Sequence, residues 1–321
     1  MMAAAANEAS SNERADNAVS ASGIADSTTI VQMQNVDFFV DPQIPLRIRT
    51  LNGKMRSRNG GTIMFDDKRS FIISVDAAEV GLTGLDLSLL LNKYVFGFKG
   101  SPLTNLRVTT SGNEIIQKGT LHKGVDIPFQ MWSVPRLQSD GRLLLHPDRL
   151  KIFGVNGTTL MHALGLHLDR MMDLSGAHGV SVKGDDLYLE PLAIIPPPTV
   201  DGKLTSVRVE GPLLIQEFAR TPEDTIFGTY AKPDSGSRNF IYFRGGQLRF
   251  GKLTMDDTDL LIHDADEADP LDLYFAEYNK QLVAGHTSNL PNYGLRTWMV
   301  DYAKVPAEPK EKTVASRARA R

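Results

Sequence analysis

Residues 125–131 read VDIPFQM, and every second side chain in this stretch is apolar. In an extended strand the four apolar side chains point to one face and the three others point to the opposite face. This alternation is typical of a β-strand that buries one face and exposes the other to water. The stretch therefore predicts a sheet with one covered face.

The same two-residue period recurs on both sides of this stretch. Residues 46–50, 71–75 and 205–209 each place apolar or β-branched side chains at every second position. Turn sequences such as Asn59-Gly60-Gly61 and Asp201-Gly202 separate these segments. Together they predict a meandering antiparallel sheet.

Three segments carry helical signals. Thr83 is a candidate N-cap for a helix over residues 86–96. Residues 158–174 repeat Leu and Met at intervals of three and four, which predicts an amphipathic helix with one apolar stripe. Residues 271–284 lie between an Asp-Pro pair, which favours a helix start, and a glycine, which favours a stop. The predicted fold class is therefore α+β.

Composition suggests how the chain is organised. Residues 1–29 contain few large apolar side chains, and so do residues 306–321, so we expect two disordered tails. Between them we place one domain over residues 30–219 and a smaller α+β extension over residues 220–305, because a polar loop rich in Gly, Pro and Asp follows residue 219. Three prolines at 196–198 predict a stiff extended connector.

The bulk composition disfavours several classes of function. The 321-residue chain has a formal net charge of -3, so it lacks the basic footprint of a nucleic-acid-binding domain. It has no cysteine, which excludes disulfides, thiolate catalysis and Cys-based zinc sites. No run approaches the roughly 20 apolar residues that span a bilayer, and no export signal is visible. We therefore expect a soluble protein, cytoplasmic by default. The basic C-terminal tail predicts a solvated segment or, alternatively, a weak peripheral contact with acidic lipid headgroups.

The sequence contains no phosphate loop, no G-x-S-x-G elbow and no H-E-x-x-H helix. His162 and His167 are five residues apart, which rotates them off a common helical face and disfavours a shared metal. The acidic stretch at 255–270 offers oxygen ligands for calcium, but Asp269 stands where an EF-hand needs Gly, and Phe275 stands where it needs Glu. We therefore predict a non-enzymatic protein with no cofactor and no metal.

The remaining candidate for a functional site is apolar. The stripe of the second predicted helix and the apolar face of the strand at 125–131 have the right periods to face each other across a slot. The predicted ligand-binding residues of this slot are Ile127, Phe129, Met131, Leu160, Leu164, Leu168 and Met171. The alternative is that these side chains form an ordinary core.

Four stretches between residues 69 and 218 carry a family resemblance. They are SVDAAEVGLTGLDLSLLLNKYV, LRVTTSGNEIIQKGTLHKGVDIPFQM, GRLLLHPDRLKIFGVNGTTLMHALGL and GVSVKGDDLYLEP with the following IIPPPTVDGKLTSVRVEG. In their order and spacing the chain resembles the LmeA-type phospholipid-binding proteins of the tubular lipid-binding (TULIP, BPI-like) superfamily. The resemblance implies a curved antiparallel sheet wrapped around two amphipathic helices, with acyl chains held between them, and it suggests a periplasmic location.

The sequence therefore predicts binding, and possibly carriage, of a lipid or another apolar small molecule. The alternative is a structural or assembly module that binds other proteins through its sheets and its acidic loop. The sequence identifies no protein partner.

Overall fold

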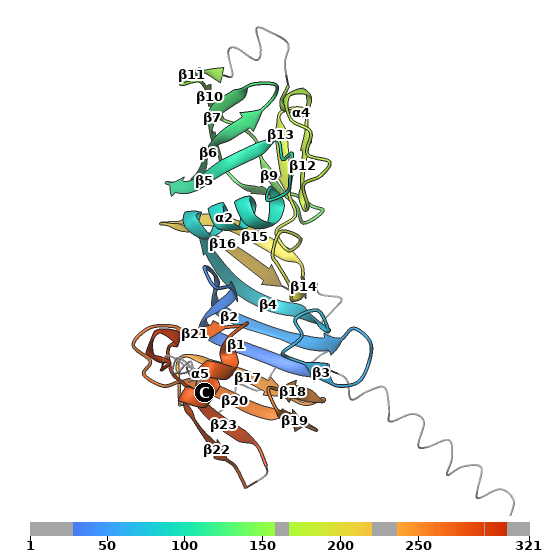
Figure 1. Ribbon diagram of the computed structural model, residues 1–321, viewed down its shortest axis with the longest axis vertical. Helices are drawn as coiled ribbons and strands as arrows, with labels where there is room; N and C mark the ends of the chain where they lie inside the picture. Colours follow the sequence, from blue (N-terminus) through green and yellow to red (C-terminus); the bar gives the residue numbers. More distant parts are fainter. Residues whose placement is uncertain (1–27, 158–166, 220–235, 292, 307–321) are drawn as a thin grey trace, which may run out of the picture.

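The computed structural model describes residues 28–157, 167–219, 236–291 and 293–306. Strands make up 53% of these residues and helices 11%, so the protein is mostly β with a few short helices, as the sequence predicts. The molecule is elongated, with the green central segment of the chain at one end and the orange and red C-terminal segment at the other (Figure 1). Within the described ranges, no helix has the length and apolar character needed to cross a membrane.

One large sheet forms the body of the molecule (Figure 1). Along the sheet the strands are β15 (Leu204–Glu210), β16 (Leu213–Ala219), β4 (Phe71–Thr83), β2 (Ile44–Ser57), β1 (Thr28–Asp41), β17 (Phe240–Arg244), β20 (Asp259–Asp264), β23 (Leu295–Met299) and β22 (His286–Asn289), with β14 (Thr199–Asp201) beside β4 and β21 (Leu271–Tyr274) beside β1. The strands at 44–57, 71–83 and 204–210 confirm the predicted two-residue periods.

The arrangement of this sheet differs from the prediction in two ways. It is mixed rather than purely antiparallel, because β14, β21 and β23 pair in parallel with β4, β1 and β20. In the described part of the chain no sheet curls around helices, as the family resemblance implied it would. The longest continuous helical stretch in the described ranges covers residues 84–95, and the other helices there have at most seven residues.

The boundary proposed near residue 220 does not divide the large sheet. Residues 30–34 of β1 pair with residues 240–244 of β17, and β17 pairs with β20. Strands that follow residue 236 therefore complete the sheet that the N-terminal strands begin.

Three smaller sheets complete the fold. The five-stranded sheet contains β11 (Val155–Asn156), β10 (Arg149–Ile152), β7 (Asp126–Ser133), β6 (Glu114–His122) and β5 (Leu103–Ser111). A four-stranded sheet contains β12 (Val180–Lys183), β13 (Asp186–Leu189), β9 (Leu143–Leu145) and β8 (Arg136–Leu137). A three-stranded sheet contains β19 (Leu253–Met255), β18 (Leu248–Phe250) and β3 (Ile63–Met64).

The first predicted helix is confirmed. Helix α2 (Gly84–Leu90) starts at Thr83, whose hydroxyl accepts a hydrogen bond from the Asp86 N–H at 3.2 Å. The Asp86 carboxylate accepts the Thr83 N–H in return at 2.7 Å, which completes a capping box. The helix continues as a π-helical turn, η2 (Leu91–Val95).

The other two predicted helices need correction. Within 158–174, residues 158–166 lie outside the described residues, and the visible helix α4 (Leu168–Met171) ends before an extended Met172. Within 271–284, the first four residues form strand β21, and only α5 (Tyr278–Ala284) is helical. The alternation of Leu271, Leu273 and Phe275 explains the strand, because all three side chains are buried while their neighbours are not. A short 3-10 turn, η4 (Tyr302–Lys304), follows β23.

Aromatic rings fill the core beside the C-terminal half of the large sheet. Phe65 lies at their centre, with ring centroids 4.7 Å from Phe250, 4.9 Å from Phe275 and 5.1 Å from Tyr278. The Phe243 ring meets Phe65 edge-on at 5.7 Å. We call this group the aromatic cluster.

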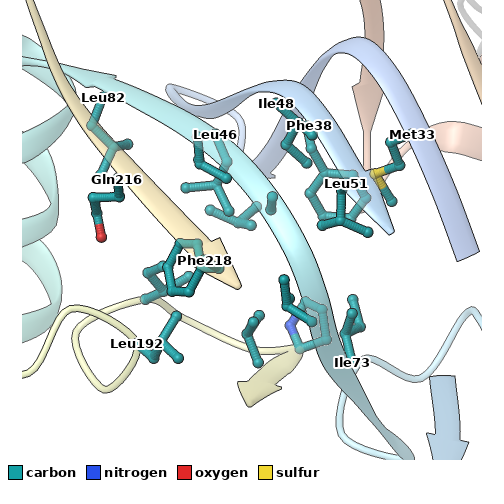
Figure 2. A pocket seen from close by; sticks show the side chains of 17 residues that line it. Met33, Phe38, Leu46, Ile48, Leu51, Ile73, Leu82, Leu192, Gln216 and Phe218 are labelled. Carbon is teal, nitrogen blue, oxygen red and sulfur yellow. The ribbon is translucent and has the colours of Figure 1, made fainter. Parts of the chain in front are cut away.

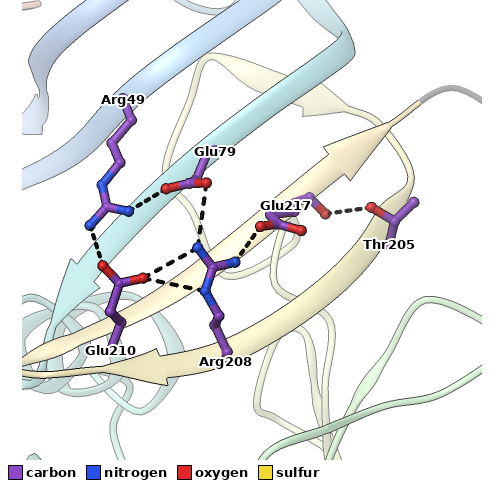
Figure 3. Close-up of polar contacts among 6 residues, drawn as sticks. All are labelled: Arg49, Glu79, Thr205, Arg208, Glu210 and Glu217. Atoms are coloured by element: carbon purple, nitrogen blue, oxygen red, sulfur yellow. Dashed lines mark hydrogen bonds and ion pairs between the residues drawn. The ribbon is translucent and has the colours of Figure 1, made fainter.

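Charged side chains cover one face of the other half of the sheet (Figure 3). Arg49 contacts Glu79 and Glu210, and Arg208 contacts Glu217 and the same two glutamates. These residues come from β2, β4, β15 and β16, so the ion pairs link four neighbouring strands. Exposed ion pairs each contribute little stability. Their presence shows that this face of the sheet is the one that faces solvent.

Candidate functional site

The opposite face of these strands lines an apolar cavity. On β4, Ala78, Val80 and Leu82 point into it, whereas Glu79 points to the charged face. Strands β1, β2 and β16 supply the rest of the floor, and the cavity volume is about 50 Å³. Every described residue that lines it is apolar except Gln216.

A segment with little regular structure forms the opposite wall of this cavity. Leu192, Ile195 and Pro198 line the cavity from the chain between β13 and β14; Leu192 is labelled in Figure 2. Val200 lines it from β14, which pairs with β4. The sequence predicted a stiff proline connector here, and the three prolines lead into β14. We call residues 192–198 the cover segment.

Gln216 is the polar exception among the lining residues (Figure 2). Only 4% of it is exposed, and its side-chain amide makes no hydrogen bond with the described residues. The fully buried side-chain atoms without a hydrogen-bond partner in the described ranges belong to Thr29, Gln32 and Ser133, so the Gln216 amide is not one of them. Gln216 is the single polar position in the described lining of the cavity.

A larger polar cleft adjoins the cavity. It has a volume of about 710 Å³, and it shares Leu192 and Val200 with the apolar cavity, so these two side chains lie between the two spaces. The charged residues that line it are Asp140, Arg142, Glu190, Asp201 and Lys203. Arg142 is paired with Asp140 at 2.7 Å and lies over the Tyr188 ring. The cleft thus offers groups of both signs beside a hydrocarbon-lined space.

The structure brings five of the seven predicted slot residues together. Ile127, Phe129 and Met131 of β7 face Leu168 and Met171 of α4 across a second cavity, whose volume is about 30 Å³. The other two, Leu160 and Leu164, lie outside the described residues. A volume of this size is about the share of one water molecule in the liquid. That this space binds a ligand stays a prediction.

Sequence reasoning missed the larger cavity. The alternation at 46–50 and 71–75 did predict a covered face, and those strands form much of the cavity floor. The cover segment follows more than a hundred residues later, and no local pattern links it to these strands. The proline run was the available signal, because prolines favour an extended chain that crosses a surface without pairing along its length.

A lysine of the chain itself, Lys304, pairs with carboxylates at the acidic stretch. The carboxylates of Asp264, Asp266 and Asp301 lie within 4.8 Å of one another. The Lys304 ammonium contacts Asp266 and lies 2.7 Å from Asp301, while Asn239 donates to Asp264 at 2.9 Å. The Lys304 contact lowers the pKa of Asp266, whereas burial raises the pKa of Asp264. These contacts give the carboxylates a structural role in holding η4 to the sheet.

Of the two histidines for which the sequence disfavours a shared metal, His162 lies outside the described residues. His167 is exposed, and its Nδ1 lies 3.2 Å from an Asp185 carboxylate oxygen. It therefore has a surface partner at the start of α4.

No protein-family model, curated protein or solved structure matches the chain. The family resemblance stays a prediction.

Proposed function

We propose that the protein binds an amphipathic, lipid-like molecule without transforming it. The apolar part of the ligand enters the cavity beneath β4, and its polar part lies in the adjoining cleft. The observation that carries this proposal is a hydrocarbon-lined cavity that adjoins an open polar cleft and shares Leu192 and Val200 with it.

The present volume of the cavity sets a condition on this proposal. An apolar cavity of about 150 Å³ accommodates benzene, whereas this one measures about 50 Å³. An acyl chain therefore enters only when the cover segment moves away from the sheet. Residues 196–198 are prolines and donate no backbone hydrogen bonds, which lowers the cost of that movement.

Two substitutions on adjacent residues of β4 test the proposal. Ala78 points into the cavity and Ala77 is exposed on the opposite face. Ala78→Leu fills the cavity, so we expect it to reduce the uptake of a fluorescent fatty acid strongly while the protein stays folded. Ala77→Leu is the matched control, and we expect uptake equal to that of the original chain.

Native mass spectrometry of the purified protein provides a second measurement, because a bound lipid adds its own mass. Protein that carries no lipid and takes up no fatty acid would overturn the proposal. Equal uptake by both alanine variants would place the ligand elsewhere. A lipid-free protein that instead co-purifies with a protein partner would favour the assembly-module alternative.

A further inference from the structure

Two neighbouring hairpin turns of the five-stranded sheet expose apolar side chains to solvent. Val125, in the turn between β6 and β7, is 63% exposed, and Phe153, in the turn between β10 and β11, is 61% exposed. Val155 follows at 58%. Because β10 pairs antiparallel with β7, the end of β10 lies beside the start of β7, and both turns lie at the same end of the sheet.

The backbone at Phe153 is unfavourable for its residue type. Phe153 and Gly154 form a two-residue turn between the paired residues Ile152 and Val155, with φ values of +50° and +79°. Such turns favour Asn-Gly, because most side chains disfavour positive φ. The chain instead places an exposed aromatic ring at this position. Fold stability does not explain that choice, so a function outside the fold is the simpler reason.

A row of basic side chains crosses the same sheet close to the Phe153 turn. Arg107, Lys118, Gln130 and Lys151 are register partners on β5, β6, β7 and β10, so they share one face. The three basic residues are exposed, and within the described ranges Arg107 and Lys118 have no ion-pair partner. The whole chain carries a formal charge of -3, so this row is a local excess of positive charge.

We propose that this end of the five-stranded sheet docks on an anionic bilayer surface. Phe153, Val125 and Val155 enter the boundary between headgroups and acyl chains, and the basic row contacts lipid phosphates. Lys151 lies two residues before Phe153, which is about 7 Å along a strand. This spacing matches the roughly 5–10 Å depth at which apolar groups of interfacial proteins are buried. An acidic protein would satisfy the basic row but would leave the apolar turns in water.

Vesicle flotation with the full chain tests this inference, and it does not depend on the ligand proposal. We expect binding to vesicles of phosphatidylcholine with phosphatidylglycerol, and much weaker binding to phosphatidylcholine alone. Phe153→Asn should lower vesicle affinity about tenfold or more, because it removes a buried aromatic group. The same change suits the positive φ, so the melting temperature should be unchanged or higher.

Two further variants keep the test specific. Arg107→Gln with Lys118→Gln should lower affinity about fivefold for each charge removed, and should weaken its salt dependence. Val283→Ser removes an apolar side chain that is even more exposed, 83% exposed on α5, and should leave flotation unchanged. Flotation that survives Phe153→Asn would overturn the proposal. So would binding that is lost only when the three arginines of the C-terminal tail are changed to Gln, or binding that is absent from anionic vesicles.

Discussion

The two halves of the large sheet are covered in different ways. Beside β17 and β20, the rings of the aromatic cluster fill the space, and Phe65 is only 2% exposed. Beside β2, β4 and β16, aliphatic side chains meet the cover segment and leave a cavity of about 50 Å³. The strands differ as well, because β2 and β4 have 14 and 13 residues whereas β17 and β20 have 5 and 6, and β20 buries five of its six residues. The close-packed half and the half with the cavity therefore differ both in their strands and in the element that covers them.

We expect the largest effect on the free energy of unfolding when one phenylalanine from each half is replaced by alanine. Phe65→Ala removes the centre of the aromatic cluster and should lower the free energy of unfolding by about 3–5 kcal/mol. Phe218→Ala, on the cavity lining, should cost less, because part of its surface already lacks packing partners. Urea unfolding of both variants measures the difference. Equal losses would mean that the two halves are packed alike.

The second cavity sharpens the comparison. Leu168 is 4% exposed and lines the 30 Å³ space at the predicted slot. If this space is a sealed core, Leu168→Ala should cost about 2–5 kcal/mol and leave fatty-acid uptake unchanged. A small stability loss together with lost uptake would instead restore the slot that the sequence predicted. Thermal unfolding and the fluorescent uptake assay on the same sample distinguish the two results.

The smallest effect concerns pH and the half of the sheet that carries the aromatic cluster. Asp272 on β21 accepts hydrogen bonds from the Tyr302 N–H at 3.0 Å and from Gln281 Nε2 at 2.9 Å, and burial raises its pKa to about 6. A raised carboxyl pKa means that the folded state binds the proton more tightly than the unfolded state. This stabilisation is fully present below pH 3.8 and is lost as pH rises through about 6.

The shift of roughly two pKa units corresponds to at most about 3 kcal/mol. Other carboxyls titrate in the same range, so the prediction is a difference between two proteins. Asp272→Asn should flatten the stability profile between pH 4 and 7 relative to the original chain, as measured by urea unfolding at several pH values. Parallel profiles for the two proteins would show that Asp272 does not couple to folding.

The elements that the sequence predicted correctly are those that depend on residues close together in the chain. The capping box at Thr83 and Asp86 depends on residues three positions apart, and the alternation along β2 and β4 needs only one covered face. The segment at 271–284 was predicted as a helix because the Asp-Pro pair before it favours a helix start and the glycine after it favours a helix end. Leu271, Leu273 and Phe275 already alternated, and pairing with β1 stabilises them as a strand.

The parts that could not be predicted depend on distant pairs. Nothing in residues 192–198 indicates that they line a cavity beneath β4, and nothing in β21 indicates a parallel partner in β1. The inward position of Gln216 was equally hidden, because a single Gln in an alternating strand normally points to water. Its burial follows from the register of β16 against β4, in which Gln216 pairs with Val80.

The central position of β1 has a consequence for synthesis. Ile30 pairs with Lys54 on one side and with Arg244 on the other. A ribosome that adds about 5–20 residues per second needs on the order of 10–40 s between these two partners. During that delay the nascent β1–β2 hairpin keeps an open, largely apolar edge, which is a template for aggregation. Closing this edge is a contact of high sequence separation, so we expect the pairing of β1 with β17 to form slowly, after residue 244 has left the ribosome.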